Sequence, residues 1–196
     1  MKDQEKKQGA GRPFTVFIDR DGVINRDSPD YIKSVDEFKF LPGSLEAFRL
    51  LNEHHFQAVV VTNQSVINRS MTSREELQKI FDVMKQAVSA WGGFIKDIMF
   101  CPHTPEEDCD CRKPKPGMII AAVEKHGIDL RRSVMIGDSA KDILCARNAG
   151  VASAVLVRTG NGLKAEQVLR DLAVLPDHVA DDLLAAVKWI VSNDTP

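Results

Sequence analysis

Residues 14–22 read Phe-Thr-Val-Phe-Ile-Asp-Arg-Asp-Gly, an apolar run that ends in two carboxylates and a glycine. The brevity of residues 14–18 and their Val, Ile and Phe content favour a buried strand. Residues two apart on an extended segment face the same side, so Asp19 and Asp21 can overhang one point. Gly22 lets the chain turn sharply there. A solvated turn is the alternative for residues 19–22 taken alone.

Short apolar runs alternate with helix-length amphipathic stretches along the rest of the chain. The runs that predict further buried strands are residues 57–61, 98–101, 133–136 and 153–157. The stretches that predict helices are residues 44–54, 73–91, 116–126 and 139–148, with a last helix at 181–191. Thr72 and Glu75 form a candidate capping box, and Gly150 is a candidate helix stop. The alternation predicts an α/β fold, a doubly wound, Rossmann-like parallel sheet with helices on both faces.

Length and composition fit one domain with a substantial core. The chain has 196 residues, 43% of them hydrophobic, and a net charge of -2. We assign residues 13–196 to this domain and residues 1–12, which are charged and contain glycine, to a flexible tail. No basic stripe points to nucleic acid or to an anionic membrane. No apolar stretch fits a signal peptide or a membrane span, so we expect a cytoplasmic protein, and a monomer would suffice.

Polar residues follow the apolar runs where the predicted strands end. In open parallel sheets ligands bind outside the carboxyl ends of the strands, so these positions are candidates for chemistry. The second run leads to Thr62, whose hydroxyl can hold a phosphate oxygen. Lys113 lies in a cationic, proline-flanked stretch ahead of a helix, and Asp138 follows the fourth run. Singly, each has an ordinary explanation: a polar strand exit, a solvated charge cluster or a turn. Asp142 falls in a first helical turn, where capping is a competing role.

Four potential zinc ligands lie within eleven residues. They are Cys101, His103, Cys109 and Cys111. Three thiolates and one imidazole fit a tetrahedral structural zinc with no position left open for substrate. A loop with buried thiols or a disulfide is the alternative, which a reducing compartment disfavours. The zinc loop, residues 101–111, ends directly before Arg112 and Lys113. It is expected to fix these cations over the strand ends, where Thr62 can hold a phosphate oxygen.

The order of Asp19, Asp21, Thr62, Lys113 and Asp138 along the chain resembles the motif order of the haloacid dehalogenase-like phosphatase superfamily. The resemblance covers residues 14–160. The resemblance implies that Asp19 is the nucleophile and forms an aspartyl-phosphate. It implies that Asp21 protonates the leaving group and then takes a proton from water. Mg²⁺ would lie between Asp19, Asp138 and the backbone carbonyl of Asp21. Lys113 and the Thr62 hydroxyl would bind the phosphate oxygens.

Side chains around this centre are expected to recognise the substrate. The candidates are Asp27, Tyr31, Asn63, Gln64, Ser65 and Arg112. Asp142 is expected to support the site from outside the reaction. The intervals between Asp19, Thr62 and Lys113 leave no room for a separate cap domain, so the site is expected to be comparatively open.

Three stretches narrow the resemblance to D-glycero-D-manno-heptose 1,7-bisphosphate 7-phosphatases, which serve bacterial surface polysaccharide synthesis. These stretches are residues 17–22, 61–65 and 109–118, while residues 66–70 read Val-Ile-Asn-Arg-Ser in place of a Gly-Ile-Ala-Arg-Gly pattern. The resemblance implies hydrolysis of a sugar phosphate. Histidinol-phosphate phosphatases share the motifs and the zinc loop and are the alternative. An inactive zinc-stabilised binding module is disfavoured because the reactive residues are all present, and a polynucleotide phosphatase because no basic stripe exists.

Overall fold

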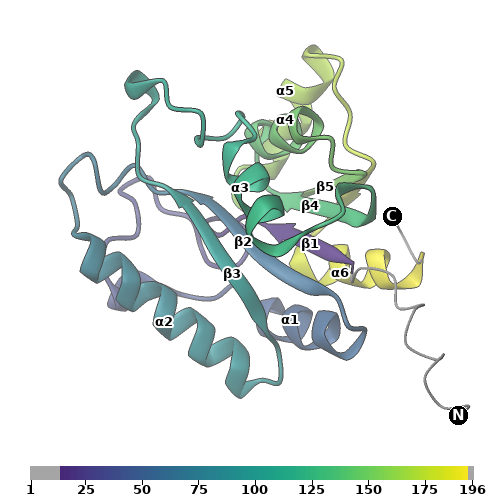
Figure 1. The fold of residues 1–196 in the computed structure, drawn as a ribbon, viewed down its shortest axis with the longest axis horizontal. Coiled ribbons are helices and arrows are strands. Elements are labelled where there is room, and N and C mark those ends of the chain that lie inside the picture. Colours follow the sequence, from purple (N-terminus) through teal and green to yellow (C-terminus); the bar gives the residue numbers. More distant parts are fainter. Residues whose placement is uncertain (1–13, 194–196) are drawn as a thin grey trace, which may run out of the picture.

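A parallel sheet of six strands runs through residues 14–193, the part of the chain that the computed structural model describes. Its strand order is β3-β2-β1-β4-β5-β6 (Figure 1). The bounds are β1 Thr15–Ile18, β2 Gln57–Asn63, β3 Ile95–Cys101, β4 Ser133–Gly137, β5 Ser153–Val157 and β6 His178–Ala180. All five strand pairings are parallel. The predicted doubly wound fold is confirmed. The predicted tail, residues 1–12, lies outside the described residues.

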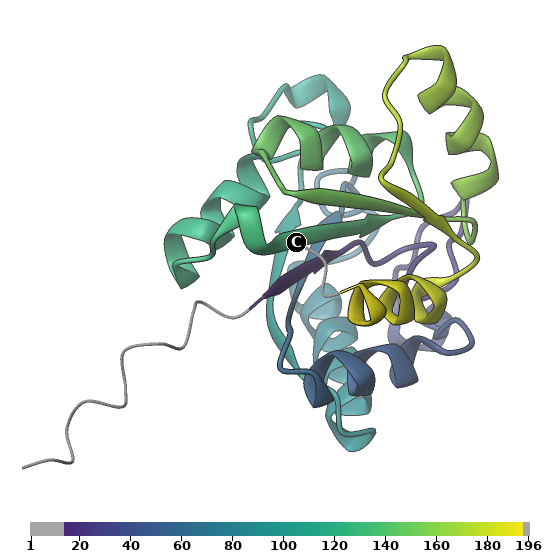
Figure 2. The ribbon, with the colours of Figure 1, turned by 90° about the vertical axis from the view of Figure 1, so that its right-hand side faces the viewer.

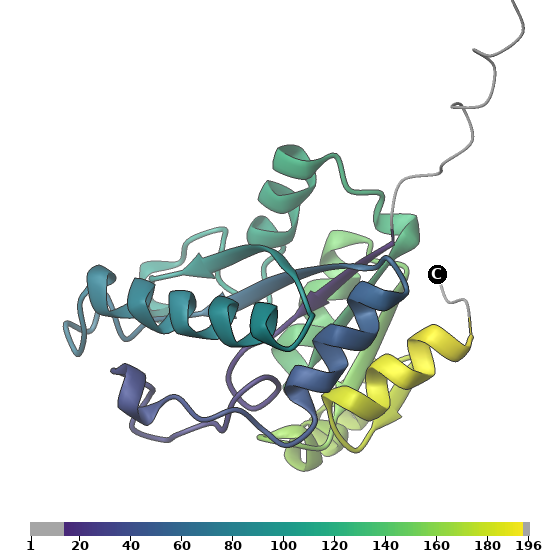
Figure 3. The same ribbon diagram turned by 90° about the horizontal axis from the view of Figure 1, so that it is seen from below.

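Six α-helices cover the two faces of the sheet within the same part of the chain. They are α1 Ser44–Glu53, α2 Arg74–Ala90, α3 Gly117–His126, α4 Ala140–Ala149, α5 Gly162–Asp171 and α6 Leu183–Ser192. Short 3-10 turns lie at Val35–Glu37, Pro105–Glu107 and Leu130–Arg132. Figures 2 and 3 show α1, α2 and α6 on one side of the sheet, and Figure 2 shows α3 and α4 on the other.

Strand alternation divides the core between the two faces. Val16 and Ile18 of β1 belong to a cluster that includes buried residues of α1, α2 and α6. Phe17, between them, belongs to a second cluster built with residues of α3, α4 and α5. All three side chains are fully buried. A strand that is apolar on both faces, as β1 is, requires helices on both sides, so the central run of residues 14–18 specifies a three-layer arrangement.

Several element boundaries differ from the sequence expectation. The sequence reading missed β6 and α5 altogether. β2 continues through Asn63, so Thr62 lies within the strand and does not follow it. The capping-box assignment at Thr72 is wrong: Ser73 is the N-cap of α2 and accepts from the Glu76 N–H at 3.1 Å. The Thr72 hydroxyl donates to the Lys33 carbonyl instead.

The helix stop predicted at Gly150 is confirmed. Gly150 ends α4 in a left-handed conformation with φ 78°. Ser70 has φ 56°, a region that favours glycine, at the position where the family pattern has glycine. The loop from residue 19 to residue 43 contains only bridges and a 3-10 turn, so no cap domain is present there. None of the helices in residues 14–193 has the length and apolar composition needed to cross a bilayer.

Candidate active site

Asp19 directly follows β1 at the centre of the sheet, where the strand order reverses and ligands of such folds bind. Its backbone N–H donates to the Ile136 carbonyl at 3.0 Å, which extends the pairing of β1 with β4. Its Oδ1 accepts from the Arg20 N–H at 2.7 Å and lies 2.8 Å from Lys113 Nζ. No hydrogen bond from residues 14–193 reaches Oδ2. One carboxylate oxygen is therefore fixed and the other is free to react.

Lys113 is a buried cation whose three N–H donors all have partners. Its Nζ lies 2.8 Å from Asp19 Oδ1 and 2.6 Å from Asp142 Oδ1, and it donates to the Val61 carbonyl at 2.8 Å. The Asn63 side chain brackets the Lys113 backbone, accepting from its N–H at 3.1 Å and donating to its carbonyl at 3.2 Å. Asn63, predicted to contact substrate, thus uses its amide to hold the lysine segment against β2.

Two more carboxylates come from the carboxyl end of β4 and the start of α4. Asp138 and Asp142 are 2% and 0% exposed. Asp142 Oδ2 accepts from the Ser139 N–H at 3.0 Å and from the Ser139 hydroxyl at 2.6 Å. The capping role weighed for Asp142 is therefore present, and its other oxygen pairs with Lys113. A side chain on Gly137 would overlap Asp142, which explains the glycine at the end of this strand.

The pKa values reflect the crowding of negative charge in a buried place. Burial, together with Asp142 and Asp138, raises the pKa of Asp19, and Lys113 opposes the shift. Burial and Asp142 raise the pKa of Asp138 to about 7. Burial alone would lower the pKa of Lys113, but Asp142 and Asp19 raise it above its usual value. The lysine therefore stays charged and is the main compensation for the three carboxylates.

This donor set fits a hard divalent cation. Ligand oxygens of Asp19, Asp138 and Asp142 lie within 4.8 Å of one another. Three carboxylates against one lysine leave a formal charge of -2, which one Mg²⁺ ion would neutralise. An all-oxygen cluster is the type of site that Mg²⁺ prefers. Because Asp142 already pairs with Lys113 and Ser139, Asp19 and Asp138 are the carboxylates available to such an ion.

Asp21 is surrounded by donors. Arg20 contacts it through Nε at 3.0 Å and through Nη2 at 2.7 and 2.8 Å. Asn25 and Gln64 each donate to it at 2.9 Å. Burial alone would raise the pKa of Asp21, but Arg20 and these amides lower it below its usual value. The sequence reading assigned no role to Arg20, although a cation between two carboxylates at a strand end was a signal for one.

Asn161, another residue that the sequence reading missed, connects two parts of the site. Its N–H donates to Asp138 Oδ2 at 2.8 Å and its side chain donates to Asp27 Oδ2 at 3.0 Å. Side chains on Gly22 or Gly160 would overlap Asp138 Oδ2, and both glycines have positive φ. The run Thr-Gly-Asn-Gly after β5 was the available signal, because such loops present backbone N–H groups.

The remaining predicted substrate contacts differ in how they connect to Asp19 and Asp138. Asp27 is linked to Asp138 through Asn161. Tyr31 lies farther out, with φ 63° and a side chain 37% exposed, and borders a surface depression with Asp27. Ser65 is buried behind the end of β2. The structure thus brings Asp27 near the centre and leaves Tyr31 at the rim.

The four predicted zinc ligands cluster at the end of edge strand β3. Cys101 Sγ lies 3.2 Å from Cys111 Sγ and 3.5 Å from Cys109 Sγ, and His103 Nδ1 lies 3.2 Å from Cys111 Sγ. All the cysteines are free, so the disulfide alternative is not present. One donor atom from each residue, all within 4.8 Å of one another, makes a cluster that is compatible with zinc, whose bonds to sulfur are about 2.3 Å.

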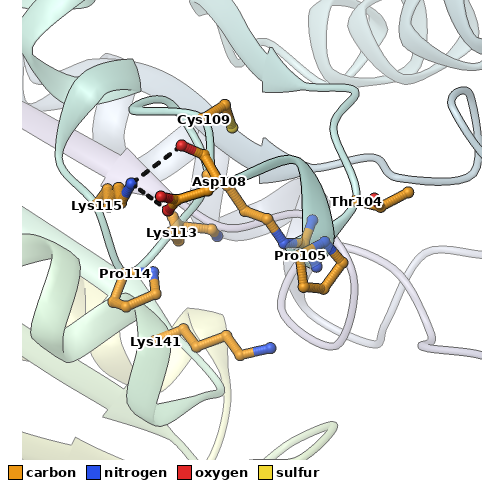
Figure 4. A pocket seen from close by; sticks show the side chains of 9 residues that line it. Thr104, Pro105, Asp108, Cys109, Lys113, Pro114, Lys115 and Lys141 are labelled. Carbon is orange, nitrogen blue, oxygen red and sulfur yellow. Dashed lines mark hydrogen bonds and ion pairs between the residues drawn. The ribbon is translucent and has the colours of Figure 1, made fainter.

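A cationic pocket of about 240 Å³ lies between this cluster and α4. Arg112, Lys113, Lys115 and Lys141 line it, with Asp108 as its acidic member. Figure 4 shows the side chains of Lys113 and Lys141 among those that line the pocket, and Lys115 paired with Asp108. The Arg112 Nη1 donates to the His103 carbonyl at 3.0 Å, which ties the guanidinium to the zinc loop.

The fold and this site are those of a haloacid dehalogenase-like hydrolase. A family model described as HAD-hydrolase-like matches residues 110–186. D-glycero-beta-D-manno-heptose-1,7-bisphosphate 7-phosphatase from Bordetella bronchiseptica is 42% identical over 149 residues, 76% of this chain and 83% of that protein. The Neisseria meningitidis serogroup B protein of the same name is 37% identical over 182 residues, covering 92% and 96%.

A solved structure gives the same result. It is D,D-heptose 1,7-bisphosphate phosphatase from B. bronchiseptica complexed with magnesium and phosphate. It has a TM-score of 0.85 and 37% identity, with 92% of this chain and 99% of that one covered. The chain belongs to the heptose bisphosphate phosphatase family.

Proposed function

We propose that the protein is a Mg²⁺-dependent phosphomonoesterase that removes the 7-phosphate of D-glycero-D-manno-heptose 1,7-bisphosphate. One observation carries the proposal: Asp19 has one oxygen fixed by Lys113 and the other free, beside Asp138, at the switch point of the sheet. The relatives with this name and the magnesium and phosphate of the related structure support the substrate and the metal.

In the first half of the reaction, Asp19 Oδ2 attacks phosphorus and the bond from phosphorus to the leaving oxygen breaks. Asp21 delivers a proton to that oxygen, so the sugar leaves as an alcohol. Lys113 keeps Asp19 oriented. Bound to Asp19 and Asp138, Mg²⁺ would offset the repulsion between the nucleophile and the phosphate and stabilise charge on the transferred group.

In the second half, water attacks the phosphorus of the aspartyl-phosphate and the bond to Asp19 breaks. Asp21, now a carboxylate, takes the proton of that water. The arrangement found here, with Arg20, Asn25 and Gln64 all donating to Asp21, is that of the ionised form. It therefore resembles the state that Asp21 must reach after it has protonated the leaving group.

The cationic pocket supports a substrate with a second anionic group. Lys113 and a metal ion suffice for the reacting phosphate, whereas Arg112 and Lys141 lie beside it and form no salt bridge within residues 14–193, although Arg112 interacts electrostatically with Glu106. Apart from the bond to His103, the guanidinium N–H groups of Arg112 make no hydrogen bond there. A planar guanidinium can bind a phosphate through two charge-assisted hydrogen bonds.

Arg112→Ala is expected to lower kcat/KM for heptose 1,7-bisphosphate by about tenfold or more, because it removes a charged contact that contributes roughly 1.5–3 kcal/mol. The loss for a small aryl phosphate should be several-fold smaller. Steady-state kinetics of wild type, Arg112→Ala and the surface control Arg132→Ala on both esters and on histidinol phosphate make the comparison. A wild type that prefers histidinol phosphate would refute the heptose assignment and support that alternative.

A bound zinc at the Cys/His cluster would support the site without joining the reaction. All four positions of a tetrahedral ion would be filled by protein, so none is left for water or substrate. Cys111 immediately precedes Arg112, and Arg112 bonds to the carbonyl of the ligand His103. The ion would therefore hold Arg112 in two ways, through the adjacent ligand Cys111 and through the carbonyl of the ligand His103. It would thereby fix the segment that leads to Lys113.

Protein purified without added zinc is expected to contain one zinc ion per chain, and Cys109→Ser and Cys111→Ser to lose it. Elemental analysis after dialysis measures this, and Cys145→Ser, a buried cysteine outside the cluster, is the control. Loss of the ion should reduce activity and increase proteolysis within residues 101–112, because metal binding contributes to local folding. Full zinc content in both loop variants would show that the ligand assignment is wrong.

The setting of this activity remains an expectation from the sequence. We expect a monomeric cytoplasmic enzyme that acts on a free sugar phosphate, without nucleic-acid or membrane partners, in the supply of heptose for surface polysaccharide.

A further inference from the structure

The Gln64 carboxamide lies between two groups of the proposed reaction. Gln64 immediately follows β2 and is 3% exposed. Its Nε2 donates to Asp21 Oδ2 at 2.9 Å and to Thr62 Oγ1 at 2.8 Å. An ionised carboxylate can only accept, so the nitrogen end of the amide must face Asp21. Both N–H groups are used within the protein, and none is left for a substrate.

The bond to Thr62 has a consequence for the direction of its hydroxyl. A threonine hydroxyl has one hydrogen to donate and can also accept. Because Gln64 donates to the Thr62 oxygen, the hydroxyl hydrogen must point away from Gln64. Thr62 is 1% exposed, and no acceptor within residues 14–193 takes that hydrogen. The hydroxyl is therefore oriented to donate a hydrogen bond. A phosphate oxygen only accepts, so it requires such a donor.

The bond to Asp21 completes the fixation of that carboxylate. Arg20 and Asn25 both donate to Oδ1, and Arg20 Nη2 also reaches Oδ2. Gln64 is the second donor to Oδ2 and the one that comes from outside the loop of Asp21, from the segment that follows β2. Arg20 and Asn25 lie in the same loop as Asp21 and would move with it. Gln64 alone among these donors fixes Asp21 relative to β2.

We propose that Gln64 is a positioning residue that sets Thr62 as a phosphate donor and holds Asp21 at a fixed distance from it. The inference rests on the proposed phosphatase activity. In that reaction Thr62 binds an oxygen of the transferred phosphoryl group, and Asp21 serves the leaving oxygen. These two atoms lie on either side of the bond that breaks. One amide that donates to both residues therefore aligns the two ends of the reacting ester.

The test replaces Gln64 by methionine, which has a similar length and no N–H donor. Wild type and Gln64→Met are compared on phenyl phosphate, 4-nitrophenyl phosphate and 2,4-dinitrophenyl phosphate, whose leaving groups need progressively less protonation. We expect kcat/KM for the phenyl ester to fall about 10²-fold, as for a small misplacement of a reacting group, and the dinitrophenyl ester to lose several-fold less. Competitive inhibition by inorganic phosphate should weaken several-fold, because the Thr62 hydroxyl can turn away.

Double variants and a matched control separate positioning from general damage. In the Thr62→Val background, Gln64→Met should no longer affect phosphate inhibition. In the Asp21→Asn background, it should no longer change the dependence on the leaving group. Gln78→Met, the same change on the exposed face of α2, should match wild type. Gln64→Glu keeps the size of the side chain but brings a carboxylate to Asp21, so it should show the same selective losses.

Two results would overturn the proposal. One is an equal loss on all three esters with unchanged phosphate inhibition, which is what a purely structural role predicts. The other is wild-type behaviour of Gln64→Met. Either result leaves an active wild type and hence the proposed function intact. A wild type that hydrolyses none of the esters, nor the heptose bisphosphate, refutes the proposed function itself.

Discussion

Asp19→Asn is expected to lower kcat by about four orders of magnitude or more while the protein stays folded. Removal of a nucleophile in comparable enzymes has effects of this size. The amide preserves the shape of the side chain, but its nitrogen cannot attack phosphorus as a carboxylate oxygen does. The oxygen next to Lys113 and the Arg20 N–H can remain an acceptor in the variant.

The same substitution relieves electrostatic repulsion, which separates this effect from unfolding. Asp19 lies beside Asp138 and Asp142, and their charges oppose its ionisation. With the charge at residue 19 removed, two carboxylates face one lysine, so the free energy of unfolding without metal should stay constant or rise. Urea denaturation measures this. Substantial turnover by Asp19→Asn would contradict the nucleophile assignment. A titration of active sites in the variant preparation, compared with wild type, excludes a contaminating phosphatase.

Lys113→Met is expected to abolish activity and to lower the free energy of unfolding by about 3–5 kcal/mol in the absence of divalent ions. Breaking a buried ion pair has a cost of this order because the partner charges lose their compensation. Here the partners are Asp19 and Asp142, at 2.8 and 2.6 Å, and the lysine is 3% exposed. Such a loss is a large part of the stability of a typical domain.

Divalent ions supply the control for this result. Mg²⁺ binds the folded form and should restore part of the lost stability, since a ligand of the native state stabilises it by mass action. It should not restore activity, because Lys113 also orients Asp19. Lys141→Met changes an exposed lysine of the neighbouring helix and should leave the stability unchanged. A Lys113→Met protein as stable as wild type without metal would show that the pair with Asp142 does not hold the site together.

The sequence predicted the parts of the molecule whose signals are local. Residues 14–18 predicted a strand buried on both faces, and the structure confirms it with clusters on either side. Helix α5 was missed although its polar and apolar positions separate about as clearly as those of the predicted helix α1, so its sequence contained a readable signal. Strand β6 has only three residues and lies at the sheet edge, where periodicity is too short to read.

For the site, the sequence indicated which residues gather but not how each side chain is used. Strand order is enough to bring Asp19 and Asp138 together, because adjacent parallel strands end at the same edge. It does not reveal that Asn63 holds the Lys113 backbone or that Gln64 faces protein partners on both N–H groups. Those assignments depend on side-chain rotamers and on contacts between residues about 50 positions apart in the sequence. A pattern of residues at strand ends contains no such information.

The attachment of the zinc loop separates a segment whose length can change from a lysine that is held elsewhere. Residues 104–108 form an exposed arch between His103 and Cys109, whereas Lys113 is fixed independently by Asn63 and Val61. Insertions or deletions in the arch can reshape the pocket wall while Lys113 stays in place, since surface loops tolerate length changes well. The loop is therefore a site at which new substrate preferences can evolve, or be engineered, on an unchanged catalytic centre.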